Sequence, residues 1–240
     1  MRISRALGTA ATTLLVPLAA GAADLEITVT NLTGGLSFTP LLVAAHPADT
    51  HLFQTGSAAS AALQAMAEGG DIAGLQAGVT AAGGQVVADP AGGLLAPATA
   101  AGVAELTTGS ANTHLSITAM LLPTNDGFVG LDGWAIPTTP GTYTVMLNAY
   151  DAGTEANTEL MNPGAGGAPG VPGIPGDPSG RAGSGGRGVV AASPNDSEPP
   201  VVHIHRGQLG DTDATGGLSD LDSRSHRWLN PVARVTVVVK

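Results

Sequence analysis

The sequence predicts an all-β protein: an antiparallel β-sandwich with one or two short helices and a long loop insertion rich in Gly and Pro. Several stretches alternate apolar and polar residues with the period of two that is typical of a half-buried strand. Gly and Pro, 35 and 17 of the 240 residues, interrupt these stretches at short intervals. Only two short Ala-rich segments have helical spacing. Many strands joined by turns, with little helix, favour a sandwich.

Length and composition limit the possible functions. A chain of 240 residues fits one domain with embellishments, which we assign to residues 24–240. Nine Lys and Arg face 19 Asp and Glu, and this acidic balance argues against nucleic acid as a partner, because phosphate binding needs basic patches. The chain has no cysteine, which excludes disulfides and Cys-ligated zinc. A core or a bound metal must therefore stabilise a secreted protein of this kind.

The first 23 residues have the pattern of a signal peptide. A basic start, Met1–Arg5, precedes an apolar run from Ala6 to Leu18 and a small-residue site, Ala19–Ala23. We expect cleavage near Ala23 and a mature protein that is secreted, periplasmic or on the cell surface. The apolar run is short for a bilayer span, and we expect no transmembrane segment in the mature protein.

The predicted strands follow from alternation and from their flanking turns. The first is the clearest, because Leu25, Ile27 and Val29 alternate with polar residues. Pro40 indicates an edge or a bulge in the second strand, and the apolar run at the end of the chain suits a strand buried on both faces. The strands span residues 24–33, 36–45, 115–121, 128–136, 142–150, 201–205 and 232–239, and the helices 57–68 and 71–82, with 81–104 a loop containing a little strand.

Residues 162–188 differ in kind from the rest. Four Gly-X-Pro triplets begin at Gly167, Gly170, Gly173 and Gly176. Gly at every third position is the rule of collagen, but four triplets are too few for a triple helix. We expect a flexible insertion without ordered structure of its own.

Acidic residues gather after the strand 142–150. Asp151, Glu155 and Glu159 follow it with no cation nearby, and Gly153 allows a sharp turn. Clustered carboxylates at the end of a strand suit a hard cation such as calcium. An ordinary solvated loop has the same composition, so both interpretations stay open. A second acidic turn, 124–132, lies one strand earlier.

Together the two turns resemble the spondin N-terminal domain family (the F-spondin and mindin-like domain), and in particular its secreted bacterial members. The resemblance is carried by the segment Asp126-Gly-Phe-Val-Gly-Leu-Asp132 and by Tyr150-Asp-Ala-Gly-Thr-Glu155. Residues 53–71 and 228–236 also resemble the family, so that most of 24–240 is covered outside the insertion. The family's domain is a C2-like sandwich, which agrees with the fold predicted above.

The resemblance implies one calcium ion at the loop end of the sandwich. Carried over to this chain, it points to Asp126 and Asp151 as ligands, with Glu155 as a third where the animal proteins have Asp. Asp132 lies about 20 Å from Asp126 if the intervening strand is extended, at roughly 3.3 Å per residue. It is therefore only a secondary candidate. Gly127 stands where the animal proteins place an aromatic residue.

A second acidic loop follows the spacing of an EF-hand. Asp211 and Asp213 occupy positions 1 and 3 of a twelve-residue loop, and Asp222 occupies position 12 in place of the usual Glu. No helix pair is predicted around it. The loop is either a second calcium site or a solvated acidic turn.

Three histidines offer a transition-metal alternative. His203 and His205 lie two apart on a predicted strand and so face the same way, and His226 could complete a three-imidazole site. The alternative is a pair of polar side chains on a solvent-facing strand.

These observations predict a secreted, calcium-stabilised, non-enzymatic binding or adhesion module whose ligand is an unidentified extracellular or cell-surface molecule. The sequence has no Gly-x-Ser-x-Gly elbow, no His-Glu-x-x-His helix and no phosphate loop. Two alternatives remain: a structural cell-surface component, or a secreted His-ligated metal protein or metalloenzyme.

Overall fold

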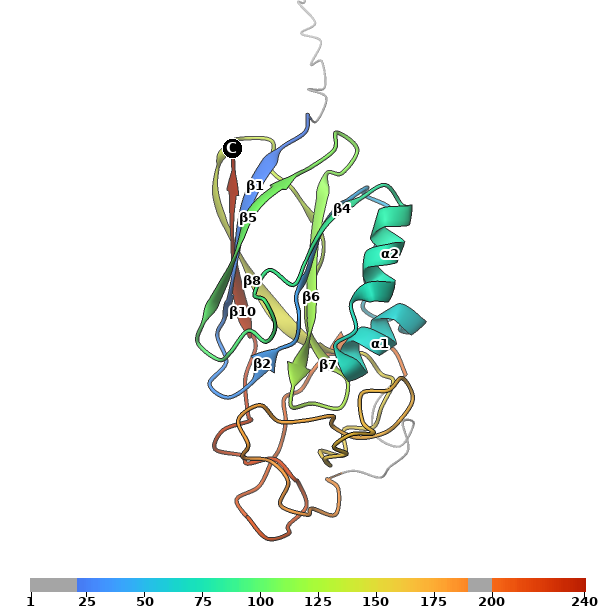
Figure 1. Cartoon of the computed structure of the whole chain (residues 1–240), viewed down its shortest axis with the longest axis vertical. Helices are drawn as coiled ribbons and strands as arrows, with labels where there is room; N and C mark the ends of the chain where they lie inside the picture. Colours follow the sequence, from blue (N-terminus) through green and yellow to red (C-terminus); the bar gives the residue numbers. More distant parts are fainter. Residues whose placement is uncertain (1–20, 190–199) are drawn as a thin grey trace, which may run out of the picture.

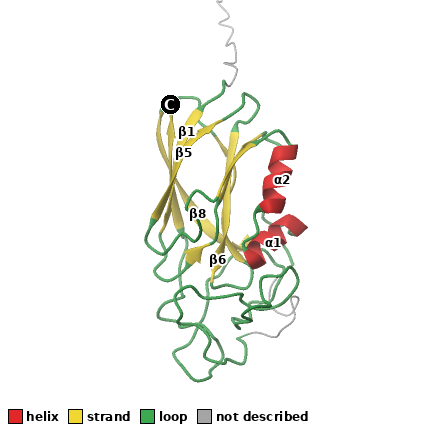
Figure 2. Cartoon of the chain, in the orientation of Figure 1, coloured by secondary structure: helices red, strands yellow, loops and turns green. Residues whose placement is uncertain are grey.

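The protein folds as two layers of antiparallel strands packed face to face, with two helices on the outside of one layer (Figures 1 and 2). The structure, a computed structural model, describes residues 21–189 and 200–240. Nearly all of the predicted signal peptide lies outside these ranges. The strands are β1 (Asp24–Asn31), β2 (Ser37–Phe38), β3 (Leu42–His46), β4 (Gln85–Ala88), β5 (Ala100–Thr107), β6 (His114–Leu122), β7 (Gly127–Ala135), β8 (Gly141–Asp151), β9 (His203–Ile204) and β10 (Ala233–Val239); the helices are α1 (Ala61–Gly69) and α2 (Ala73–Ala81).

The strand order is β4-β3-β6-β7-β8-β10-β1-β5, and every neighbouring pair is antiparallel. Strand β8 belongs to both layers. Its first part, residues 141–147, pairs with β10, and its last part, residues 148–151, pairs with β7. The two end strands, β4 and β5, contact each other, so the sheet is nearly closed. The predicted all-β sandwich is therefore confirmed.

The core has two parts because the two helices add a third layer. One cluster fills the space between the strand layers, and the other lies between the helices and the outer face of β3 and β6. As a result β6 is buried on both faces: Ile117 and Ala119 point to one side, and Thr118 and Met120 to the other. Alternate residues of β6 therefore face two different buried clusters, one between the strand layers and one under the helices, rather than core and solvent.

The closing strand β10 differs from the prediction. Val235, Val237 and Val239 are buried, but Arg234 is exposed and Val238 is half-buried, so the strand is buried on one face only. In the described part of the chain, no helix covers the outer face of this layer (Figure 2). An apolar run alone cannot distinguish the two cases, because β-branched residues also favour the exposed face of a strand.

Local signals account for the helix boundaries. The Ser60 side chain accepts a hydrogen bond from the Leu63 amide and caps α1. Gly70, with φ +75°, ends α1 in the left-handed conformation that favours glycine. Pro40 separates β2 from β3, which divides the predicted second strand in two.

A long irregular region forms one end of the molecule. Apart from the short β9, the described residues between β8 and β10, 152–189 and 200–232, form loops. These loops lie at the opposite end from the C-terminus and the start of β1 (Figure 1). The start of β1 lies beside the C-terminus: the Lys240 amide donates to the Asp24 carbonyl at 3.0 Å.

The insertion 162–188 packs against the sandwich. It has no helix or strand, as expected, but Ile174 is fully buried and the amide of Gly170 donates to the buried carboxylate of Glu68 at 2.6 Å. Only glycine fits at position 69, because a Cβ there would lie 2.1 Å from the Gly167 carbonyl oxygen. Flexibility of the segment stays a prediction, but the segment is not a detached loop.

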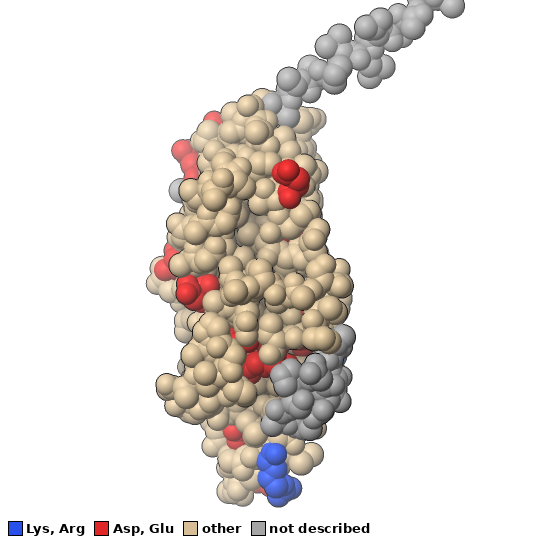
Figure 3. Space-filling model, turned by 90° about the vertical axis from the view of Figure 1, so that its right-hand side faces the viewer, with Lys and Arg blue, Asp and Glu red and all other residues tan. Residues whose placement is uncertain are grey.

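The surface is sparsely charged. Figure 3 shows acidic side chains scattered over one face and basic side chains only near the loop end. Within residues 21–189 and 200–240, no helix is long and apolar enough to cross a membrane.

Candidate functional site

The pairing of β7 with β8 brings the two predicted acidic turns together. Gly127, the first residue of β7, pairs with Asp151, the last residue of β8. Asp126 immediately precedes Gly127, so the antiparallel register places the backbones of Asp126 and Asp151 side by side at the loop end. Gly127 also lies close to Thr124, whose Oγ1 would be 2.9 Å from an added Cβ. A side chain at residue 127 would therefore crowd Thr124, which suits the glycine found there.

Asp126 is fully buried. One carboxylate oxygen, Oδ2, accepts hydrogen bonds from the backbone amides of Thr154 and Glu155 at 2.8 and 3.1 Å. The other, Oδ1, has no partner among the described residues. Burial, and then the nearby charge of Asp151, raise the pKa of Asp126 well above its usual value.

Asp151 organises the start of the loop. Its Oδ1 accepts from the Gly153 amide at 2.8 Å, in a turn where Gly153 has φ +70°. Its Oδ2 accepts from the Asn157 side-chain amide at 2.6 Å. The Nε2 atoms of His203 and His205 lie 4.0 and 3.9 Å from the same oxygen.

Glu155 is the third predicted ligand and is also buried. Its Oε2 accepts from the Asn125 side chain at 3.1 Å and from the Gly173 amide at 2.9 Å. Its Oε1 is buried without a hydrogen-bond partner in the described ranges. Burial raises the pKa of Glu155 to about 7.

Two unpartnered carboxylate oxygens in a buried acidic site fit a cation. Burying a carboxylate is costly unless its charge is paired, and a hard cation bound by oxygen supplies that pairing. In the described parts of the chain, however, no three Asp, Glu or His side chains converge closely enough to hold a metal by themselves. Calcium also accepts backbone carbonyls, amide oxygens and waters as ligands, and the loop is rich in such groups.

Asp132 is separate from this site. Its Oδ2 lies 2.6 Å from His51 Nδ1, and its Oδ1 accepts from the Leu52 amide at 2.7 Å. These contacts tie the far part of β7 to the segment that follows β3.

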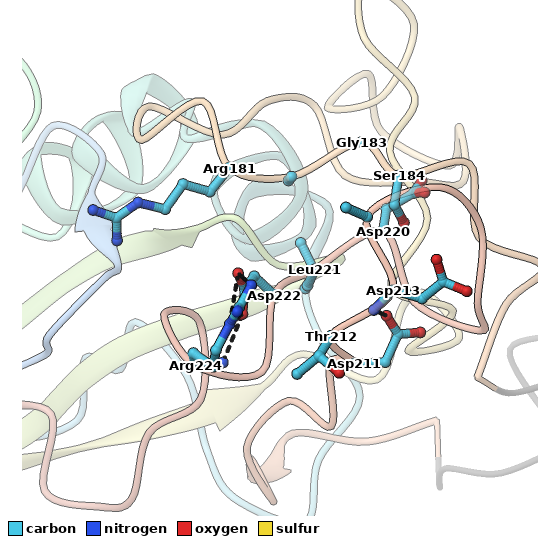
Figure 4. Close-up of a pocket in the computed structure, with 12 residues that line it drawn as sticks. Arg181, Gly183, Ser184, Asp211, Thr212, Asp213, Asp220, Leu221, Asp222 and Arg224 are labelled. Carbon is cyan, nitrogen blue, oxygen red and sulfur yellow. Dashed lines mark hydrogen bonds and ion pairs between the residues drawn. The ribbon is translucent and has the colours of Figure 1, made fainter.

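The second acidic loop forms a small pocket of about 120 Å³ (Figure 4). Asp211 accepts from the amides of Leu218 and Ser219, and Asp213 from the amide and hydroxyl of Thr215. Asp222 pairs with Arg224 at 2.7 Å, which lowers the pKa of Asp222 to about 2. Backbone amides and Arg224 therefore hold these carboxylates in place, and the second calcium site remains a prediction.

The structure separates the three histidines. His203 and His205 lie beside Asp151, whereas His226 is buried with its Nε2 3.5 Å from Asp177. Nδ1 of His205 accepts from the Gly207 amide, so a neutral ring carries its proton on Nε2 and has no free lone pair for a metal. Nδ1 of His226 likewise accepts from the Asp222 amide. Neither ring is oriented as a metal ligand.

Sequence reasoning placed Glu159 in the acidic cluster but missed its role in holding the loops together, and it missed Asp220 altogether. Glu159 accepts from two amides, Leu209 and Gly210, and from the Ser219 hydroxyl at 2.6 Å. Asp220 accepts from the amides of Met161, Gly185 and Gly186. These contacts join segments up to 60 residues apart in the chain. No local sequence pattern predicts these long-range contacts.

The comparison with protein families agrees with the geometry. A family model described as Spondin_N matches residues 30–171, more than half of the chain. The matched range contains Asp126, Asp151 and Glu155, and ends before the loop 211–222 and the three histidines. No curated protein matches the chain.

Proposed function

Because the chain belongs to the spondin N-terminal domain family, we propose that it is a calcium-stabilised β-sandwich that acts outside the cytoplasm as a non-enzymatic binding or adhesion module. In this proposal Asp126, Asp151 and Glu155 hold one calcium ion at the loop end. The ion would neutralise the buried carboxylates and fix the loop that follows β8.

One observation carries the metal proposal: two buried carboxylate oxygens, Asp126 Oδ1 and Glu155 Oε1, without hydrogen-bond partners in the described residues. Each belongs to a carboxylate whose other oxygen accepts two backbone or side-chain amides. Such an arrangement orients the remaining oxygen and leaves its lone pairs for another ligand.

The extracellular and non-enzymatic parts of the proposal rest on other support. The N-terminal pattern of Met1–Ala23 favours export, and the family supports an extracellular binding role. The motifs for nucleophilic and metallohydrolase chemistry sought in the sequence were not found. The ligand of the module is addressed below.

Thermal unfolding with and without calcium tests the metal. A ligand that binds only the folded state stabilises it by about 2.7 kcal/mol at a hundredfold excess over Kd. We expect a chelator to lower the melting temperature by several degrees and added calcium to restore it. Asp151→Asn should abolish this response, because it removes charge from the centre of the site.

Asp222→Asn is the matched control, since it changes the same residue type in the other acidic loop. It should keep most of the calcium response. Identical melting curves in chelator and in millimolar calcium would falsify the metal proposal, and loss of the response only in Asp222→Asn would move the ion to the loop 211–222.

A further inference from the structure

A second concave site lies away from the acidic loop end, between the segment after β3 and strands β7 and β8. It has a volume of about 280 Å³ and is lined by His51, Phe53, Gln54, Thr55, Asp132 and Tyr150. This volume is at the lower end of the range of small-molecule sites. Lys and Arg are absent from the lining, which consists of described residues only.

His51 and Asp132 give this pocket a preset hydrogen-bonding group. The Asp132 carboxylate can only accept, so His51 Nδ1, 2.6 Å away, donates to it. An imidazole that is neutral in this orientation presents the lone pair of Nε2, and the side chain remains 37% exposed. The Leu52 amide holds the other Asp132 oxygen at 2.7 Å, which fixes the carboxylate that orients the ring.

Aromatic rings form the apolar wall of the pocket. Phe53 packs against Tyr150 with ring centroids 4.8 Å apart, and edge-on against Phe128 at 5.0 Å. Gly130 makes this packing possible, because a Cβ at that position would lie 2.6 Å from the Phe53 ring. The Tyr150 phenol is half-buried, and its hydroxyl can both donate and accept hydrogen bonds.

We propose that this pocket binds a neutral polyhydroxylated ligand, one sugar ring in size. An anion is disfavoured by the Asp132 charge and by the absence of a cationic side chain in the lining described above. A metal cation is disfavoured because Asp132 is the one carboxylate among the described residues that line the pocket. A sugar presents hydroxyls that suit His51 Nε2, Gln54, Thr55 and Tyr150, and apolar C–H faces that suit an aromatic wall.

The assignment gives the proposed binding module a ligand class, but it does not require the calcium ion. Asp132 and His51 contact none of the three proposed calcium ligands. Binding measured in chelator and in calcium therefore distinguishes failure of the metal proposal from failure of this one.

Saturation-transfer NMR with the full mature chain tests the pocket. The probes are the methyl glycosides of glucose, galactose, mannose and N-acetylglucosamine, with glucuronate as an anionic comparison. We expect at least one neutral glycoside to bind in the millimolar range and glucuronate to bind more weakly. Tyr150→Phe and Thr55→Val each remove one hydroxyl with little change of shape and should weaken binding roughly two- to tenfold.

Tyr143→Phe is the matched control, because Tyr143 is the only other tyrosine and its hydroxyl bonds the Thr139 carbonyl, outside the pocket. It should bind like the unaltered chain. The proposal is overturned if no neutral glycoside binds, if glucuronate binds best, or if Tyr150→Phe and Thr55→Val bind as well as Tyr143→Phe.

Discussion

At the scale of single residues, the carboxyl group of Glu155 makes the stability of the folded protein depend on pH. Its pKa is raised from 4.5 to about 7 in the folded protein, mainly by burial, so the native state holds this proton more tightly than the unfolded chain. Without metal, the resulting stabilisation is complete below about pH 4.5 and is lost as the pH rises through about 7. Asp126 shifts in the same direction.

We therefore expect the chelated protein to melt at a higher temperature at pH 5 than at pH 8, as measured by circular dichroism. Glu155→Gln should reduce this pH dependence, since the amide needs no proton. Glu105→Gln is the control, because Glu105 is 73% exposed and should leave the dependence unchanged. A chelated protein that becomes more stable between pH 5 and pH 8 would contradict the buried-carboxyl interpretation.

At the scale of elements, the insertion 162–188 behaves as part of the loop end. Gly170 and Gly173, three residues apart, donate their amides to Glu68 and Glu155. Both glycines have positive φ, +79° and +112°, a backbone conformation that favours glycine. Ile174 directly follows Gly173. It is fully buried and exchanges backbone hydrogen bonds with the segment 160–162.

Ile174→Ala should consequently destabilise the protein by about 2–5 kcal/mol, as expected for a buried isoleucine. Urea unfolding measures the change. Ile204→Ala is the matched control: Ile204 is 47% exposed, and its loss should cost little. Equal stability of the two variants would mean that the insertion contributes no packing.

The elements also show which features a sequence can reveal. Alternation in Leu25–Val29 and the helical spacing of the Ala-rich segment 57–68 are local signals, and both predicted their elements. The neighbours of an element are not local. The second buried face of β6 depends on helices 50 residues earlier, and the one-sided burial of β10 depends on the absence of a covering helix in the described chain.

The dependence on distant neighbours also limits how much of the candidate site the sequence can predict. Asp126 and Asp151 were found because each stands in a motif at the edge of a predicted strand. The roles of Glu159 and Asp220 depend on amides far away in the chain, and the pocket at His51 depends on the register of β7 against the segment after β3. Acidic residues that resemble ligands, such as Asp211, accept backbone hydrogen bonds instead.

At the scale of the whole molecule, strand β8 joins the two layers. Because residues 141–147 pair with β10 and residues 148–151 with β7, neither layer can lose its pairing without disturbing this strand. We expect one cooperative unfolding transition in urea. Trp134 reports on β7 and Trp228 on the loop end, so Trp134→Phe and Trp228→Phe each leave one fluorescent probe. Their midpoints should coincide with that from circular dichroism once corrected for each variant's stability; two separated transitions would show independent layers.

The position of the two chain ends has a mechanical consequence. β1 starts and β10 finishes at the same end of the molecule, as adjacent antiparallel strands, and the irregular loops occupy the other end (Figure 1). An anchor at either terminus would hold the loops outward, away from the anchoring surface. Tension applied through both termini would instead open the β1–β10 ladder one hydrogen bond at a time, whereas a pull between one terminus and the loops would load many of these bonds at once. The fold thus resists force along the sandwich better than force across its paired ends.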